Sequence, residues 1–237
     1  MPGILGTGVI HPADLLTIAL LVVLEGLLSV DNAMVLAVLV LGLPDHQQRK
    51  ALRYGILGAF AFRTAATLLA VFLIGLWWVK LVGGGYLLYL VVQHFGGGES
   101  AEERRTPKQA KPWLGLSAFW ATVVKVELTD LVFAIDSILV GVAMSPKPWV
   151  VISGGCLGIV ALRLLIGQLL SIVKRYPPLV DGAFIIISWV ALKLLVEFLH
   201  SAGLIALVIP TWLSLTLIVV IFLAALVYSI VEERRRL

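Results

Sequence analysis

The sequence predicts an all-α, polytopic membrane protein with seven transmembrane helices, and three observations lead to this fold class. Of the 237 residues, 60% are hydrophobic and only 14% are charged, which excludes an ordinary soluble domain of this size. The apolar residues form seven runs, six of them long enough for the roughly 20 helical residues that cross a bilayer. Lys and Arg are concentrated in alternate connections between the runs.

The seven runs are bounded by charged residues, Gly or Pro and lie at 14–42, 49–75, 79–95, 113–144, 149–173, 179–199 and 204–231. If the N-terminal side is the outer side, the inner segments contain twelve of the 18 Lys and Arg residues, and the outer segments contain only Lys80 and Lys147. Inner connections rich in Lys and Arg are typical of cytoplasmic loops. The predicted topology is therefore N-outside and C-inside.

The basic inner segments also account for the positive net charge of +4. Attraction to anionic lipid explains such loops, so no nucleic-acid partner is expected. The polar segment 96–112 mixes both charge signs and is interpreted as a flexible cytoplasmic linker. We therefore expect four parts: a three-helix unit at 1–95, this linker, a second three-helix unit at 113–200, and a seventh helix with a basic end at 201–237.

The two predicted three-helix units repeat each other. Residues 25–32 align with 130–137, because each segment has an acid, five further residues, an acid and a small polar residue. Residues 55–63 (G-I-L-G-A-F-A-F-R) match 155–163 (G-C-L-G-I-V-A-L-R) at five of nine positions. A unit of three helices reverses its direction through the membrane when it is repeated. The sequence thus predicts a 3+3 inverted repeat, an architecture of secondary transporters whose substrate site lies where the repeats meet.

The aligned segments carry carboxylates inside apolar runs. A central Asp in a transmembrane helix costs about 2.5 to 3.5 kcal/mol on insertion scales, so several of them indicate a functional site. The candidate metal ligands are five carboxylates and one amide, all of which offer oxygen atoms: Glu25, Asp31, Asn32, Glu127, Asp130 and Asp136. Without His or Cys, such a set suits a hard dication such as Mg²⁺, Ca²⁺ or Mn²⁺.

Basic and hydroxyl side chains are expected to support this site. Arg63 and Arg163 occupy equivalent positions of the repeat and are interpreted as counter-ions. The other candidate supporting residues are Lys125, Ser29 and Ser137. On a straight helix, Glu127 and Asp136 would lie on opposite faces. Either the helices unwind near the acids, or some acids bind the ion while others pair with the arginines or carry protons.

Four segments carry a resemblance to a known family: L-E-G-L-L-S-V-D-N-A-M-V-L-A at 24–37, A-L-R-Y-G-I-L-G-A-F-A-F-R at 51–63, G-G-Y-L-L-Y-L at 84–90, and V-K-V-E-L-T-D-L-V-F-A-I-D-S-I at 124–138. They resemble the TerC family of integral membrane proteins, whose members are similar to manganese exporters of the LysE-type transporter superfamily. The resemblance covers nearly the whole chain. It implies Mn²⁺ efflux across a bacterial cytoplasmic membrane, with Mn²⁺ as the transported substrate and no cofactor.

Two functions other than transport could also explain acids in apolar helices. One is a non-transporting membrane scaffold in metal or tellurite stress, in which the acids only anchor Arg63 and Arg163. The other is an intramembrane aspartyl hydrolase, but five acids exceed the two that a catalytic dyad needs, so we expect no enzyme activity. The seventh helix is expected to serve either as a homodimer contact or as a brace that faces lipid.

Overall fold

The computed structural model describes residues 12–28, 30–69, 78–107, 109–113 and 115–236, and these residues form helices and connections with no β-strand. The helices are α1 (Pro12–Leu28), α2 (Val30–Val40), α3 (Asp45–Leu68), α5 (Trp78–Phe95), α6 (Ala101–Arg105), α7 (Ala118–Met144), α8 (Pro148–Arg175), α9 (Pro178–Ser201) and α10 (Thr211–Arg236). Each apolar run of the sequence therefore contains a helix, and residues 70–75 of the second run lie outside the described residues.

Helix boundaries follow local sequence signals. The Ser117 side chain caps α7 by accepting a hydrogen bond from the backbone N–H of Trp120, which satisfies one of the four unpaired donors of a helix start. Pro148 begins α8 and Pro178 begins α9, at positions where the missing N–H costs nothing. Gly203 follows α9 with a positive φ of 73°. The first apolar run is described as α1 and α2, which lie on either side of residue 29, and residue 29 is outside the described residues.

Three helices of the described part are long and apolar enough, by length and composition, to cross a membrane: Pro148–Arg175, Pro178–Ser201 and Trp212–Glu233. The helix α7 has sufficient length, with 27 residues, but it carries Lys125, Glu127, Asp130 and Asp136. Intramembrane charges of this kind lower the hydropathy of a span that contains a functional site. The count of seven spans and the N-outside topology stay predictions.

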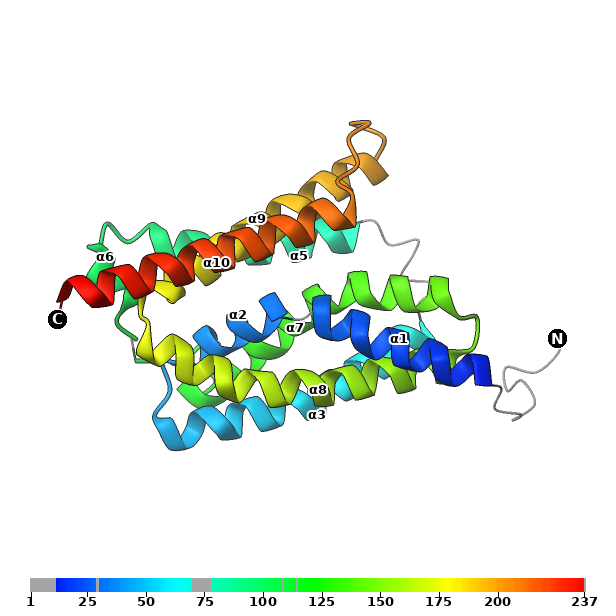
Figure 1. Ribbon diagram of the computed structural model, residues 1–237, viewed down its shortest axis with the longest axis horizontal. Helices are drawn as coiled ribbons and strands as arrows, with labels where there is room; N and C mark the ends of the chain where they lie inside the picture. The colour runs from blue at the N-terminus through cyan, green and yellow to red at the C-terminus, as the bar shows by residue number, and fades with distance from the viewer. Residues whose placement is uncertain (1–11, 29, 70–77, 108, 114, 237) are drawn as a thin grey trace.

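The helices form two groups (Figure 1). A five-helix bundle contains α1, α2, α3, α7 and α8, and a three-helix layer contains α5, α9 and α10. Within the bundle, α1 packs on α8 and α3 packs on α7, while α5 packs along α9 in the layer. The first helix of each predicted unit thus contacts the second helix of the other unit, and the two third helices contact each other.

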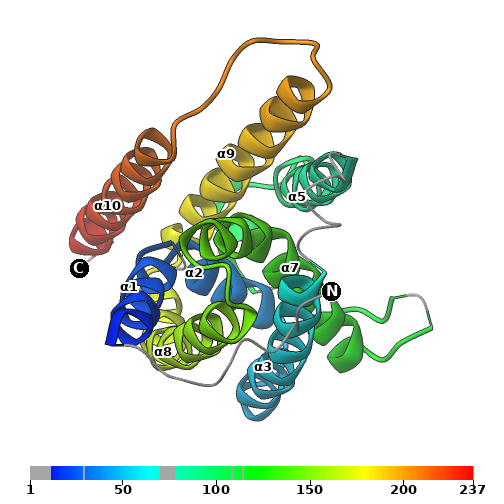
Figure 2. The same cartoon turned by 90° about the vertical axis from the view of Figure 1, so that its right-hand side faces the viewer.

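The helix α2 lies at the centre of the bundle, as the end-on view in Figure 2 shows. Ala33, Val35, Ala37 and Val40 have no exposed surface, and α2 contacts α7, α8 and α9. Its buried side chains belong to one apolar core that continues into α5 and α9. Glu25 lies in the last turn of α1, and α2 contains Asp31 and Asn32, so the core holds the backbone of this acidic segment from several sides.

The linker between the two units is held in place, which differs from the flexible segment expected. Its short helix α6 begins with a capping box made by Ser100 and Glu103. The Nε atom of Arg105 donates to Asp181 at 2.7 Å, and its Nη1 atom lies 3.1 Å from Glu232. Asp181 also bonds to His94 at 2.9 Å. Ion pairs to α9 and α10, which no local pattern reveals, tie α6 to the three-helix layer.

Candidate functional site

A buried ion pair joins α1 and α3. The Nη2 atom of Arg63 lies 2.7 Å from Oε1 of Glu25, and these residues are only 5% and 7% exposed. Arg63 also donates from Nη1 to the carbonyl oxygen of Gly155 at 3.3 Å and from Nη2 to Oγ of Ser137 at 3.1 Å. One guanidinium therefore connects α1, α3, α7 and α8.

Glycine allows α8 to approach this ion pair. A Cβ atom built on Gly158 would overlap the Cβ and Cγ atoms of Glu25. One on Gly155 would come within 2.7 Å of Cδ of Arg63, closer than real Cβ contacts. These two glycines bring the backbone of α8 against both members of the pair, leaving beside them a cavity of only about 20 Å³.

The carboxylate of Glu127 on α7 packs against glycines of α3, as Glu25 on α1 packs against a glycine of α8. A Cβ atom on Gly58 would overlap its carboxylate group, and one on Gly55 would lie 3.4 Å from its Oε1 atom. Both oxygens of Glu127 are shielded from solvent and have no hydrogen-bond partner in the described part of the chain. An enclosed carboxylate without a partner is costly, so this position requires a compensating cation or proton.

Two further predicted ligands, Asp130 and Asn32, are also withdrawn from solvent. Asp130 is half-buried one turn after Glu127, and it is close enough to Arg63 and Glu25 to interact with both electrostatically. Asn32 is 4% exposed, and its Oδ1 atom has no hydrogen-bond partner among the described residues. The structure thus offers several oxygen atoms that are enclosed and not engaged.

The remaining predicted residues are placed only by their backbones or lie elsewhere. Asp31 is on α2, Asp136 on α7 and Arg163 on α8, with side chains outside the described part, and Ser29 lies outside the described residues. The Nζ atom of Lys125 lies 5.9 Å from the ring centre of Trp113. Among the side chains that the structure describes, no group of three His, Cys, Asp or Glu residues is arranged to hold a metal.

The helix α7 is continuous through all three of its acids, so the first of the two alternatives, local unwinding, does not apply there. The other arrangement, in which the acids divide their tasks, agrees with the ion pair of Glu25 and with the unpaired oxygens of Glu127. Glu25 faces Gly158 and Glu127 faces Gly58, the equivalent glycine of the repeat. By these contacts Glu127 corresponds to Glu25, whereas the sequence alignment matched Glu25 with Asp130.

Some structural residues of the site were not recognised in the sequence. Gly58 and Gly158 are equivalent in the repeat, but they were interpreted only as markers of duplication. The hydroxyl of Tyr86 donates to the carbonyl oxygen of Lys125 at 3.2 Å and lies 3.3 Å from Oγ1 of Thr129, which is fully buried. The segment G-G-Y-L-L-Y-L contains Tyr86, but its partners are 39 and 43 residues away.

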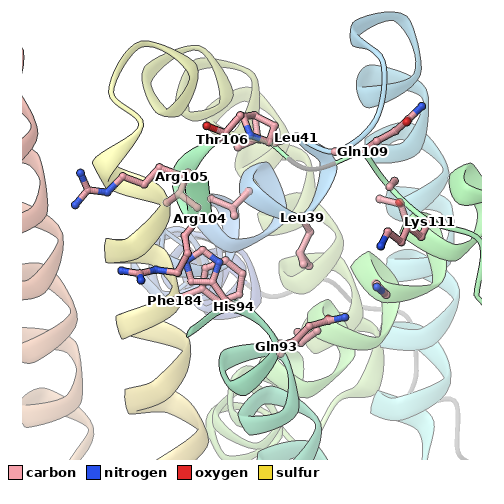
Figure 3. Close-up of a pocket in the computed structure, with 18 of the residues that line it drawn as sticks. Leu39, Leu41, Gln93, His94, Arg104, Arg105, Thr106, Gln109, Lys111 and Phe184 are labelled. Atoms are coloured by element: carbon pink, nitrogen blue, oxygen red, sulfur yellow. The ribbon is translucent and has the colours of Figure 1, made fainter. Parts of the chain in front are cut away.

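A larger pocket opens at the linker end of the molecule. Its volume is about 360 Å³, and it is lined by residues of α2, α5, α7 and α9 together with the linker. Figure 3 shows Arg104 and Arg105 on one side of it and Gln109 and Lys111 on the other. Its wall on α7 reaches Lys125, two residues before Glu127.

Comparisons with known proteins identify relatives along most of the chain. The profile of the Integral membrane protein TerC family matches residues 10–237. The uncharacterized membrane protein YceF of Bacillus subtilis is 46% identical over 182 residues, covering 76% of this chain and 70% of YceF. A second B. subtilis protein, the uncharacterized membrane protein YkoY, is 38% identical, covering 73% of this chain and 57% of YkoY.

A more distant relative has a functional name. The Salmonella typhi protein named as a membrane-bound redox modulator, Alx, is 27% identical over 228 residues, which cover 81% of this chain and 71% of that protein. No solved structure matches.

Proposed function

The chain belongs to the TerC family of integral membrane proteins, and we propose that it transports a divalent metal cation across a bacterial cytoplasmic membrane, with Mn²⁺ efflux as its activity. The observation that carries this proposal is the enclosed carboxylate of Glu127, which has no hydrogen-bond partner in the described part. A buried carboxylate in this state calls for a positive charge. A transported cation would supply that charge each time the site is filled.

The chemistry of the neighbouring side chains favours a hard dication. Asp130, one turn after Glu127, and the buried Asn32 add oxygen atoms, and the predicted set includes no sulfur or imidazole. Carboxylate and amide oxygens suit Mn²⁺, Mg²⁺ and Ca²⁺. Asp31 and Asp136 complete the proposed ligand set, and Arg63, which already balances Glu25, serves as a counter-ion that remains when the ion leaves.

The transporter architecture forms part of the same proposal. The reciprocal packing of α1 on α8 and of α3 on α7 is the pattern expected where two inverted repeats meet around a central site. The chain would cross the membrane seven times, with the linker and the basic C-terminus in the cytoplasm. The helix α10 packs on α9 and stands outside the repeat.

Manganese flux into liposomes tests this function. Purified protein is reconstituted, and uptake of Mn²⁺ is followed with a trapped metal-sensitive dye, under a proton gradient of either direction and without one. The intact chain should move Mn²⁺, while Glu127→Gln and Asp130→Asn should reduce the flux at least about tenfold, because one lost charged ligand costs more than 1.4 kcal/mol. Glu197→Gln is the matched control, since Glu197 pairs with lysines in the three-helix layer. Absence of Mn²⁺ movement under every gradient would exclude the proposal.

A scaffold without transport is the second candidate, and the ion pair of Glu25 and Arg63 favours it. If these charges only hold helices together, the double variant Glu25→Gln with Arg63→Gln should protect manganese-stressed cells as well as the intact chain does. Transport through the proposed site predicts that this double variant loses protection and accumulates Mn²⁺. Measurement of cell Mn and growth distinguishes the two functions.

A further inference from the structure

A groove lies between the first turns of α3 and the last turns of α8, at the linker end of the bundle. Its volume is about 620 Å³, within the range of about 300 to 1,000 Å³ that is usual for ligand pockets. The two helices run side by side on the side of the bundle that faces away from the three-helix layer (Figures 1 and 2). The described residues that line the groove include none of the proposed cation ligands.

The rim of this groove carries more positive than negative charge. Lys174 of α8 lies 2.8 Å from Asp45 of α3, which neutralises it. Arg49 and Arg53 of α3 also line the groove and are exposed, and they form no ion pair or hydrogen bond with the described residues. Two positive charges are therefore left without a partner in this part of the structure.

The spacing of these two arginines favours an anionic ligand. Arg49 and Arg53 are four residues apart, so they lie on the same face of α3. Like charges at this spacing destabilise a helix, and an anion that lies between them removes the repulsion. The oxygen atoms of a phosphate group accept hydrogen bonds from guanidinium groups in a geometry that fits well. The arginine pair thus indicates a ligand that carries a phosphate.

The rest of the groove is apolar. Its described lining includes Leu52, Ile166 and Leu170, which are 7%, 5% and 7% exposed. On the face of α3 that carries Arg53, the next residue toward the middle of the helix is Leu57, which is 66% exposed. At 1.5 Å per residue, Leu57 lies about 6 Å further from the linker end than Arg53 does. A ligand that matches this surface has its anionic group at the end of the helices and an apolar part along them.

The helix α8 leaves room for such a ligand and places it near the membrane surface. A Cβ atom built on Gly167, which lines the groove, meets no other atom within 4 Å. The helix is long and apolar enough to cross a membrane, and its last turn carries Lys174 and Arg175. Basic residues at the end of a span lie close to lipid phosphates, and basic pockets between transmembrane helices bind anionic headgroups.

We propose that this groove binds one anionic phospholipid, whose phosphate lies between Arg49 and Arg53 and whose acyl chains follow the apolar surface past Leu57. The lipid fills the space between α3 and α8 and neutralises the two arginines. These helices also carry the glycines that face Glu127 and Glu25. The bound lipid therefore stabilises the relative position of the two helices against which these carboxylates pack. The inference does not depend on which ion the protein transports.

Native mass spectrometry of the full chain, purified in detergent and freed of lipid, tests this site. Phosphatidylglycerol, which carries a net negative charge, is added at increasing concentrations, and phosphatidylcholine, which is neutral overall, is added in a parallel series. The unaltered chain should bind one phosphatidylglycerol at least about tenfold more tightly than phosphatidylcholine, as expected for two charge-assisted contacts. Equal affinity for the two lipids would overturn the proposal.

A pair of double variants separates the groove from general attraction to charge. Arg49→Gln with Arg53→Gln should weaken binding of phosphatidylglycerol at least about tenfold. Lys50→Gln with Arg175→Gln is the matched control, because it removes the same charge from the same ends of α3 and α8 but outside the described lining of the groove. This control should retain the tight site. Equal losses in both double variants would reject a specific site.

Gly167→Leu tests the groove without any change of charge. Its side chain would occupy the space that the lipid needs, and Leu favours a helix more than Gly does. The variant should therefore fold with an unchanged or higher Tm and still bind phosphatidylglycerol more weakly, which decides the question even if the arginine variant fails to fold. Unchanged binding in Gly167→Leu would place the lipid elsewhere and overturn the proposal.

Inorganic phosphate distinguishes a phospholipid from a free anion as the occupant. An excess of phosphate should not displace phosphatidylglycerol from the unaltered chain, because phosphate makes no contact with the apolar surface. Displacement at a phosphate concentration that leaves the arginine double variant unaffected would assign the groove to a free anion and reject the lipid.

Discussion

The five-helix bundle and the three-helix layer both contain carboxylates below the surface, but they treat them differently. In the layer, Asp181 binds His94 and Arg105, and Glu197 lies 2.8 Å from Lys80 and 3.3 Å from Lys193. In the bundle, Glu127 has no hydrogen-bond partner in the described part. Carboxylates of the layer therefore hold helices together, whereas the bundle keeps a carboxylate available.

This contrast separates architecture from function on physical grounds. A fully satisfied polar network stabilises one arrangement of helices, whereas an unsatisfied buried group raises the free energy of the folded state. Natural proteins retain such groups mainly at functional sites. The bundle is accordingly the part of the molecule where stability and function are expected to conflict, and the four predictions below test this difference in order of decreasing effect.

The largest effect is expected from Arg63→Gln. Loss of the guanidinium removes the cation that lies 2.7 Å from the buried carboxylate of Glu25, and breaking a buried ion pair from one side costs about 3 to 5 kcal/mol. Arg105→Gln is the matched control in the layer, because Asp181 keeps His94 as a partner. Thermal unfolding in detergent should show a large drop in Tm for Arg63→Gln and a small one for the control. Equal drops would show that the two regions do not differ.

A second prediction compares Gly158, which faces Glu25, with Gly58, which faces Glu127. Gly158→Ala pushes against the Cβ and Cγ atoms of Glu25, whose carboxylate Arg63 holds, whereas Gly58→Ala meets the far end of the Glu127 side chain. Overpacking costs about 1 to 3 kcal/mol where neighbours cannot move. We expect Gly158→Ala to lose about 1 to 3 kcal/mol of stability and Gly58→Ala to lose much less. The shift in Tm measures both losses. A larger loss for Gly58→Ala would show that Glu127 is the more rigid glutamate.

These two predictions depend on contacts between helices, and the sequence predicts the helices better than it predicts these contacts. Hydropathy located the described helices, since apolar length is a local property, but their ends differ from the predicted ones, most at α10, which begins at Thr211 rather than at residue 204. The equivalence of Arg63 and Arg163 predicted counter-ions, but not that Arg63 meets Glu25 or the backbone of Gly155, which is 92 residues away. Similarly, the linker was expected to be flexible. The Ser100–Glu103 capping box is a local signal that could have indicated α6, but no local signal indicates its ion pairs to Asp181 and Glu232. Such partners depend on how the helices pack.

The third prediction has the opposite sign. Glu127→Gln replaces an unpaired carboxylate by a neutral group of nearly the same shape, so it should stabilise the protein by about 1 kcal/mol, the low end of the cost of an unsatisfied buried group. The same variant should reduce Mn²⁺ flux at least about tenfold. Glu197→Gln, which breaks two lysine contacts, should lower Tm instead. A Glu127→Gln protein with lower Tm would contradict the view that this carboxylate is kept at the expense of stability.

The smallest effect is expected at Asp45, which belongs to the bundle but is exposed. Its pKa lies below the usual 3.8 because Lys174 donates a hydrogen bond to it and adds a nearby positive charge. A lowered carboxyl pKa gives stability that is present above the unfolded-state pKa and is lost as the pH falls through the folded-state pKa. Because Asp45 is 88% exposed, solvent screens the pair. Asp45→Asn should therefore leave Tm unchanged near neutral pH and reduce only the loss of stability below 3.8. Since Asp45 and Lys174 connect the ends of α3 and α8, a fall in Tm at neutral pH as large as that of Gly158→Ala would show that membership of the bundle, rather than burial, makes its charges important.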